Sequence, residues 1–268
     1  MNYSLLFRLE AYQIALVLFL GMIATYILGR TLAKSWRTRI VEPKGEGLVE
    51  GGGVGAILGA LFALFGLILA FTFGMSGSRY EGVRNIMIEE ANDIGTVILR
   101  TDLYPDSMRK ILKEELKNYV EARIAYYDHA SDLDKFQKAK EDADRSGGMV
   151  WTSVAEFSKI QPNLVVPNMQ MIPALNSMID IATTRDVLLK SRVPDAIVIT
   201  LIILTLTISF IGGFTTPRLG SKDWVVIIGF ALLTALIIYL TLDLGRPMRG
   251  FIKVEQGQQA LIDLRKMF

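Results

Sequence analysis

The sequence contains no cysteine and a single histidine, His129, among its 268 residues. The lack of cysteine excludes disulfide bonds, thiol catalysis and cysteine-based metal sites. One histidine is too few for the histidine clusters that bind zinc, and it leaves little material for imidazole acid–base catalysis. We therefore expect no metal site and no cofactor.

A strong net charge is also missing, because 29 lysines and arginines face 27 acidic residues. No basic stretch with interleaved aromatic residues is present, which argues against a nucleic-acid partner. The GxSxG, HExxH and P-loop signatures are absent, as is a GxGxxG placed after a strand. The sequence therefore predicts a protein that is not an enzyme.

Hydrophobic residues, in contrast, are abundant: they make up 51% of the chain. Four apolar stretches reach the roughly 20 residues that a bilayer core requires. They cover residues 11–29, 51–75, 196–214 and 224–244. We predict an integral protein of the plasma (inner) membrane that spans the lipid bilayer four times.

Between the second and third spans lies a polar insert with helical periodicity and no alternating strand pattern. We therefore expect an all-α membrane protein in which the insert forms an extramembrane helical domain. The predicted organisation is 1–76 with spans one and two, 77–193 as the helical domain, 194–245 with spans three and four, and 246–268 as a C-terminal tail.

Local signals divide the insert into several helices. Leu-Tyr-Pro-Asp at 103–106 breaks the helix that leaves span two, and a buried stripe is expected on the next helix. Its members are Ile111, Leu112, Leu116, Tyr119, Val120, Ile124 and Tyr127. Gly147-Gly148 is expected to end a third helix that Ser131 caps, and a short helix should follow at 150–160. The last helix is expected at about 172–192, after a loop at 162–167.

Small residues recur at every fourth position where span two begins: Gly51, Gly55 and Gly59. In lipid, such a ridge lets helix backbones approach closely. Two interpretations stay open, which are packing around a central axis in an oligomer and packing within one chain against span one or four.

Three acidic residues follow on the helix that leaves span two: Glu89, Glu90 and Asp93. We expect these side chains to form a solvated helix face or to pair with Arg84 or Arg100. The alternative role is that they bind a cation. Asp180 and Arg185 on the last insert helix are expected to pair with these groups across the bundle.

The spans themselves carry almost no ionisable residue, apart from Asp243 at the edge of the fourth. Because coupled transporters hold charged groups at mid-membrane, this pattern favours a passive pore or a scaffold that transports nothing. Arg246 and Arg249 form a basic collar, which either contacts lipid headgroups or attracts anions.

The orientation follows from the short loops. Basic residues are concentrated between spans one and two and between spans three and four, including Arg30, Lys34, Arg37 and Arg218. By the positive-inside rule, these loops are cytoplasmic and the helical domain is extracytoplasmic.

Long stretches of the chain resemble one family. FTFGMSGSRYEGVRNIMIEEANDIGTVILRTDLYPD, PALNSMIDIATTRDVLLKSRVP and LDLGRPMRGFIKV, with a terminal LIDLR, are similar to the bestrophin-like family of bacterial membrane proteins. The segment LILAFTFGMSGSRY also resembles the second helix of bestrophin anion channels. This resemblance implies a pore lined by Ala63, Leu67 and Phe71, inorganic anions as the permeating ions and a pentameric homo-oligomer. The resemblance also implies that the helical domain is cytosolic. The loop charges place it on the extracytoplasmic side, and we favour the orientation given by the charges.

Together these observations lead to one functional hypothesis and one alternative. The hypothesis is an oligomeric, passive ion channel that conducts anions, with span two lining the pore. The alternative is a membrane-anchored interaction or sensing module whose spans anchor and oligomerise while the helical domain binds a partner. A lipid-contacting protein is a third, weaker interpretation.

Overall fold

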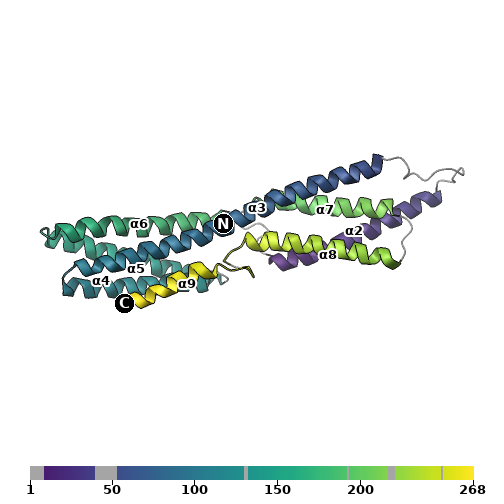
Figure 1. The fold of residues 1–268 in the computed structure, drawn as a ribbon. Helices are drawn as coiled ribbons and strands as arrows, with labels where there is room; N and C mark the ends of the chain where they lie inside the picture. Colours follow the sequence, from purple (N-terminus) through teal and green to yellow (C-terminus); the bar gives the residue numbers. More distant parts are fainter. Residues whose placement is uncertain (1–8, 40–52, 130–131, 192, 217–220, 249) are drawn as a thin grey trace. The chain divides into compact units, whose positions relative to one another are not determined.

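The computed structural model describes residues 9–39, 53–129, 132–191, 193–216, 221–248 and 250–268. The chain divides into two compact units. One contains residues 1–78 and 193–245, and the other contains residues 79–192 and 246–268. All regular elements in the described part of the chain are helices (Figure 1), so the all-α prediction is confirmed.

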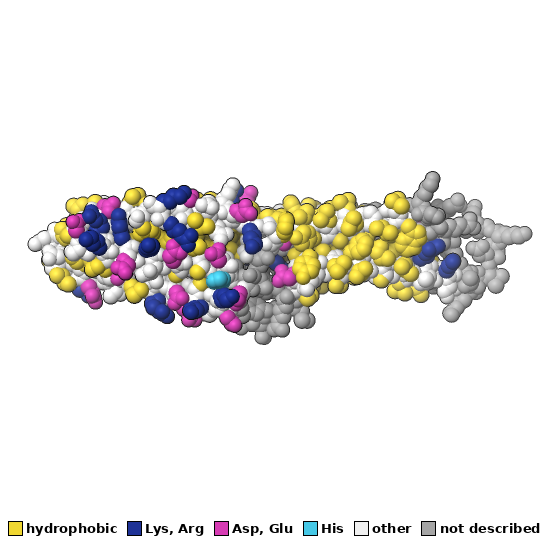
Figure 2. Space-filling model, turned by 90° about the horizontal axis from the view of Figure 1, so that it is seen from below, with side chains coloured by type: hydrophobic (Ala, Val, Ile, Leu, Met, Phe, Trp, Pro, Cys, Tyr) yellow, Lys and Arg dark blue, Asp and Glu magenta, His cyan; other side chains and the backbone are white. Residues whose placement is uncertain are grey.

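Four helices of the first unit are long and apolar enough to cross a membrane, as the sequence predicts. They are α2 (Ala11–Arg39), the first part of α3 (Gly53–Arg100), α7 (Asp195–Thr215) and α8 (Ser221–Leu244). On the face drawn in Figure 2, the surface over these helices carries mainly hydrophobic side chains, whereas the second unit carries charges of both signs. The protein is therefore an integral membrane protein.

Helices α2 and α7 cross at two glycines that sequence reasoning missed. A Cβ atom on Gly29 would overlap the backbone carbonyl oxygen of Phe210, and one on Gly213 would overlap that of Tyr26. Only glycine permits this approach, which replaces side-chain contacts by backbone packing. The sequence signals that could have indicated this crossing are the final glycine of YILG, which is Gly29, and the glycine pair 212–213 in FIGGF.

Hydroxyl groups buried in this unit find their partners within their own helices. The hydroxyl of Thr72 donates to the carbonyl of Ile68 at 2.7 Å, and that of Thr205 donates to Leu201 at 2.7 Å. Because lipid offers no partner for a hydroxyl group, this bond to the preceding turn satisfies each of these two hydroxyl groups within its own helix.

The second unit is a bundle of helices around a hydrophobic core. Its elements are the second part of α3, η1 (Thr101–Leu103), α4 (Asp106–Asp128), α5 (Leu133–Ile160), α6 (Val165–Lys190), α9 (Glu255–Asp263) and η2 (Leu264–Met267). The predicted stripe on α4 is buried except for Ile111, which is half exposed. Leu112, Leu116 and Val120 are fully buried in the core.

The C-terminal residues that the sequence analysis set apart as a tail belong to this bundle. Gly257 of α9 lies so close to α3 that an added Cβ would be 2.7 Å from the Cβ of Met87. Arg265 binds Glu121 of α4 through two parallel bonds of 2.7 and 2.6 Å. The end of the chain therefore docks on two helices of the bundle.

Two predicted helix boundaries in the insert are wrong. Gly147-Gly148 does not end a helix, because α5 continues from Leu133 to Ile160. Each glycine costs a helix only about 1 kcal/mol, which packing of the flanking turns offsets. Helix α6 begins at Val165 rather than near residue 172, and it contains Pro173. The expected cap Ser131 lies outside the described residues; Asp132 caps α5 by accepting a bond from the Lys135 amide.

Candidate functional site

The part of α3 within the first unit presents an apolar face that the chain itself does not cover. Ala63, Leu67 and Phe71 lie at intervals of four residues and all are exposed; Leu67 is 54% and Phe71 65% exposed. In the most apolar 18-residue stretch of α3, only 11% is buried inside the chain, compared with 28–39% for the corresponding stretches of the other three spans. This helix therefore contributes the least to the core of a single chain.

The opposite face of α3 supplies the packing. Phe65 and Leu69 contact the small core around Leu18, Met22 and Ile238. Phe62 meets Phe230 of α8 edge to face, with ring centroids 5.6 Å apart. The helix is thus held on one side by its own chain, and the predicted pore-lining side is open.

The glycine ridge lies on α3 as well. No atom of the described chain lies within 4 Å of a Cβ built on Gly55 or Gly59. Packing within one chain, one of the two interpretations of the ridge, therefore does not use these two positions. Gly51 lies outside the described residues.

The three acidic residues predicted on α3 have different environments. Glu89 is exposed, Asp93 is half buried and Glu90 is completely buried. Burial, together with the nearby Glu89 and Glu90, raises the pKa of Asp93. Among the described residues, no group of three or more acidic or histidine side chains is placed to hold a metal ion. The cluster is therefore not a joint ligand set.

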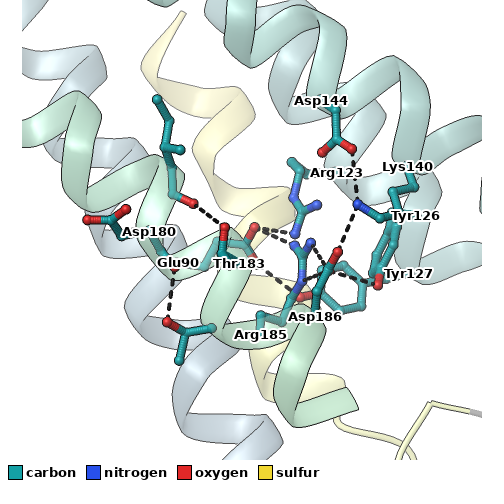
Figure 3. A network of polar contacts seen from close by, with 12 residues as sticks. Glu90, Arg123, Tyr126, Tyr127, Lys140, Asp144, Asp180, Thr183, Arg185 and Asp186 are labelled. Atoms are coloured by element: carbon teal, nitrogen blue, oxygen red, sulfur yellow. Dashed lines mark hydrogen bonds and ion pairs between the residues drawn. The ribbon is translucent and has the colours of Figure 1, made fainter. Parts of the chain in front are cut away.

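Glu90 is instead the centre of a buried ion network (Figure 3). Its Oε1 accepts a bond of 2.7 Å from Nη1 of Arg185 and pairs with Arg123, while the hydroxyl of Tyr127 donates to Oε2 at 2.9 Å. Both arginine side chains are only 1% exposed. Glu90 thus pairs with Arg185 and Arg123 rather than with Arg84 or Arg100, and the contact with Arg185 joins α3 to α6 across the bundle.

The network extends from Arg185 towards the surface. Nη2 of Arg185 donates to Oδ1 of Asp186 at 2.7 Å, and Nζ of Lys140 lies 2.8 Å from Oδ2 of the same carboxylate. Lys140 also pairs with Asp144 at 3.0 Å. Three cations therefore alternate with three anions, and their formal charges cancel.

Tyr126 and burial determine the electrostatics of this network. The guanidinium carbons of Arg185 and Arg123 lie 4.5 and 4.9 Å from the centroid of the Tyr126 ring, within cation–π range. Burial raises the pKa of Glu90, and Arg123 and the Tyr127 hydroxyl oppose that rise. Burial also raises the pKa of Tyr127 well above its ordinary value, so this hydroxyl remains a donor. These groups join α3, α4 and α6 inside the bundle.

Arg79, the first residue of the second unit, caps the end of α6. Its guanidinium donates to the carbonyl oxygens of Leu188 and Leu189, each at 3.1 Å, and to the carbonyl and hydroxyl of Ser191. The last carbonyls of a helix lack partners within the helix, so a cation there satisfies both their bonding and the helix dipole. The neighbouring Tyr80 hydroxyl donates to the Lys253 carbonyl at 3.2 Å.

The predicted basic collar is described only in part. The backbone carbonyl of Arg246 accepts a bond of 2.8 Å from the amide of Gly250. Arg249 lies outside the described residues. The interaction of the collar with headgroups or anions stays a prediction.

Comparison with known proteins identifies the family. A model of the bestrophin-like domain matches residues 14–258, which is most of the chain. The chain belongs to the bestrophin-like family. The recognition made from the sequence motifs is thereby confirmed. No curated protein matches the sequence.

Solved structures show how far the fold of this bestrophin-like protein is shared. A bacterial bestrophin homologue from Klebsiella pneumoniae aligns with a TM-score of 0.67 at 13% identity, over 94% of this chain and 96% of the homologue. A tryptophan-to-alanine mutant of a bacterial bestrophin homologue from the same organism gives 0.65 at 12% identity, over 99% and 100%. The predicted bestrophin-like architecture is therefore confirmed along nearly the whole chain.

Proposed function

We propose that this protein is a passive, anion-conducting channel formed by several copies whose α3 helices surround a common axis. The observation that carries the proposal is the open apolar face of α3, where Leu67 and Phe71 stay exposed although the opposite face is packed. An apolar ring of this kind gates a pore by excluding water. Membership of the bestrophin-like family supports the same function.

The proposal extends to the ion and the assembly. Aromatic ring edges carry partial positive charge, so a ring of Phe71 side chains favours an anion over a cation. The buried ion network has no net formal charge and lies in the second unit, so the proposal does not draw on it. We expect a homo-oligomer, and the family resemblance favours a pentamer. The helical unit faces the extracytoplasmic side.

Chloride flux from liposomes that contain the purified protein tests conduction, and light scattering of the protein in nanodiscs tests assembly. We expect flux above that of empty liposomes and a mass of several copies. A monomer, or no flux under varied pH, calcium and voltage, would contradict the channel.

The orientation of the helical unit is tested by cysteine labelling. A cysteine at Ser177 should react with a membrane-impermeant thiol reagent on intact cells, and a cysteine at Ser35 should not.

A second function, a membrane-anchored interaction module, is favoured by one observation. Helix α6 exposes large apolar side chains in the water-facing unit: Val166 is 66% exposed, Met169 69% and Val187 64%. Exposed apolar patches outside the membrane are typical of protein-binding surfaces. Two results together would favour this function over the channel. The oligomer would conduct no ions, and its helical unit would bind a partner protein in a pull-down.

A further inference from the structure

The helical unit contains a pocket of about 490 Å³ in addition to its buried core. This volume lies within the range of small-molecule sites, roughly 300–1,000 Å³. Helix α5 contributes Lys140, Asp144 and Trp151 to the wall, and helix α6 contributes Asn176 and Asp186. The pocket thus opens at the surface end of the buried ion network, which the proposed channel function does not use.

The charged groups around the pocket are already paired with one another. Nζ of Lys140 lies 3.0 Å from Oδ2 of Asp144 and 2.8 Å from Oδ2 of Asp186. The buried Arg185 holds the other oxygen of Asp186 at 2.7 Å. Two cations therefore balance two anions. A ligand with a net charge would leave one charge uncompensated, so the wall favours an uncharged ligand.

The same wall keeps several hydrogen-bonding groups available. The ammonium of Lys140 has three donors and uses two of them on carboxylates. Within the described chain, neither the side-chain amide of Asn176 nor the indole N–H of Trp151 forms a hydrogen bond. The Trp151 side chain is 37% exposed and so offers an aromatic surface. Donors, acceptors and an apolar plane therefore meet in one pocket.

Gly148 also lines this pocket, and the packing of the chain does not explain it. Its neighbour Gly147 makes room for Tyr119, since a Cβ there would lie 3.3 Å from the tyrosine ring. A Cβ on Gly148 would meet no atom of the described residues within 4 Å. A glycine inside a helix costs about 1 kcal/mol relative to alanine. At Gly148 the pocket wall therefore carries no side chain.

We propose that this pocket binds a neutral, polyhydroxylated ligand, a carbohydrate, whose ring stacks on Trp151 while its hydroxyl groups bond to Lys140, Asp144 and Asn176. Hydroxyl groups both donate and accept, which matches the mixed groups on the wall. A zwitterionic amino acid would have to break the existing ion pairs, and a nucleobase would leave most of these polar groups unmatched. The site is independent of conduction.

Fluorescence of Trp151 tests the proposal directly. Replacing Trp36 and Trp224 by phenylalanine leaves Trp151 as the reporter in the full-length protein, which is studied in nanodiscs. Glucose, N-acetylglucosamine and cellobiose are the probes, with glutamate and adenosine for comparison. We expect a saturable change with at least one sugar at millimolar concentration and none with glutamate or adenosine.

Two variants locate the binding. Gly148→Leu fills the pocket and has a higher helix propensity than glycine, so we expect lost sugar binding with an unchanged or higher melting temperature. Asn176→Ala should weaken binding about tenfold, as expected for loss of a polar contact. Lys138→Ala, on an exposed part of α5, should bind normally. The proposal is wrong if no sugar binds the folded protein, if Gly148→Leu binds sugar equally well, or if only glutamate or adenosine binds.

Discussion

At the scale of single residues, Glu90 shows how a buried charge depends on its partners. The carboxylate is fully buried between two arginines whose side chains are 1% exposed. Such a group is tolerated only when its charge and its hydrogen bonds are satisfied together. Tyr127 and Arg185 each supply a bond to it, at 2.9 and 2.7 Å. The three charges therefore depend on one another.

Replacing Glu90 by glutamine removes the anion but keeps the shape of the side chain. Two arginine cations then remain buried together, which should lower the free energy of unfolding by about 3–5 kcal/mol. Glu89→Gln is the matched control, because Glu89 is the exposed neighbour and should change stability by about 0.5 kcal/mol or less. Thermal unfolding in detergent measures both. Equal melting temperatures would show that the network contributes no stability.

Phe71 is the residue on which the proposed pore depends most. If several copies surround an axis, Phe71→Ala widens and hydrates the constriction and should raise chloride flux severalfold. Leu67→Ala should act in the same direction. Phe65→Ala is the control on the same helix, because Phe65 packs against the core of its own chain and should affect folding more than flux. Similar flux from all three variants would place the pore elsewhere.

At the scale of elements, the sequence predicts helices well where the signal is local. Twenty apolar residues in a row identify a span, and Leu-Tyr-Pro-Asp correctly marks the end of the long helix α3 at Arg100. Contacts between distant residues are not encoded locally. Gly147 predicts a helix end from the local sequence, whereas in the fold it makes room for the ring of Tyr119. Arg185, the partner of Glu90, is 95 residues away in the sequence.

The crossing of α2 and α7 leads to a prediction about glycine. Gly29→Ala places a methyl group into the backbone of α7 at Phe210, so the helices must separate. Overpacking of this kind costs about 1–3 kcal/mol or more. Gly229→Ala on α8 is the control, because its Cβ meets nothing within 4 Å among the described residues. Unfolding in a detergent series should separate the two variants, and identical curves would refute the close crossing.

The docking of α9 should depend on pH through Glu121. The hydrogen bonds from Arg265 lower the pKa of Glu121, so this pair stabilises the folded state above the ordinary glutamate pKa of about 4.3 and loses its contribution as the pH falls further. Amide exchange of α9, corrected for its intrinsic rate, should therefore rise modestly below about pH 4. Arg265→Gln should raise exchange already at neutral pH. A variant that exchanges like the wild type would show that α9 is held by its other contacts, such as the burial of Leu261 in the core and the bond from Gln258 to Asp128.

At the scale of the whole molecule, the membrane and water-facing units could be predicted because lipid and water demand opposite compositions. The boundary at Ser78 and Arg79 lies two residues from the predicted one at 76 and 77. The place of residues 246–268 could not be predicted, since nothing in their polar sequence indicates which helix they contact. The assembly that we propose would depend on surfaces that a single chain leaves open, and we propose the glycine ridge as one of them.

Assembly is therefore tested best at Gly55, where an added Cβ would meet no side chain or other helix of the described chain within 4 Å. A leucine there should leave the fold of one copy intact, yet its side chain would hold neighbouring helices apart if they meet at this ridge. We expect Gly55→Leu to reduce the oligomer mass in light scattering and to abolish cross-links, while the melting temperature of the helical unit stays unchanged. Gly229→Leu, an equally open position on α8, is the control for added bulk on a lipid-facing helix. If Gly55→Leu assembles and conducts like the wild type, the ridge faces lipid, and the copies must contact one another through other residues.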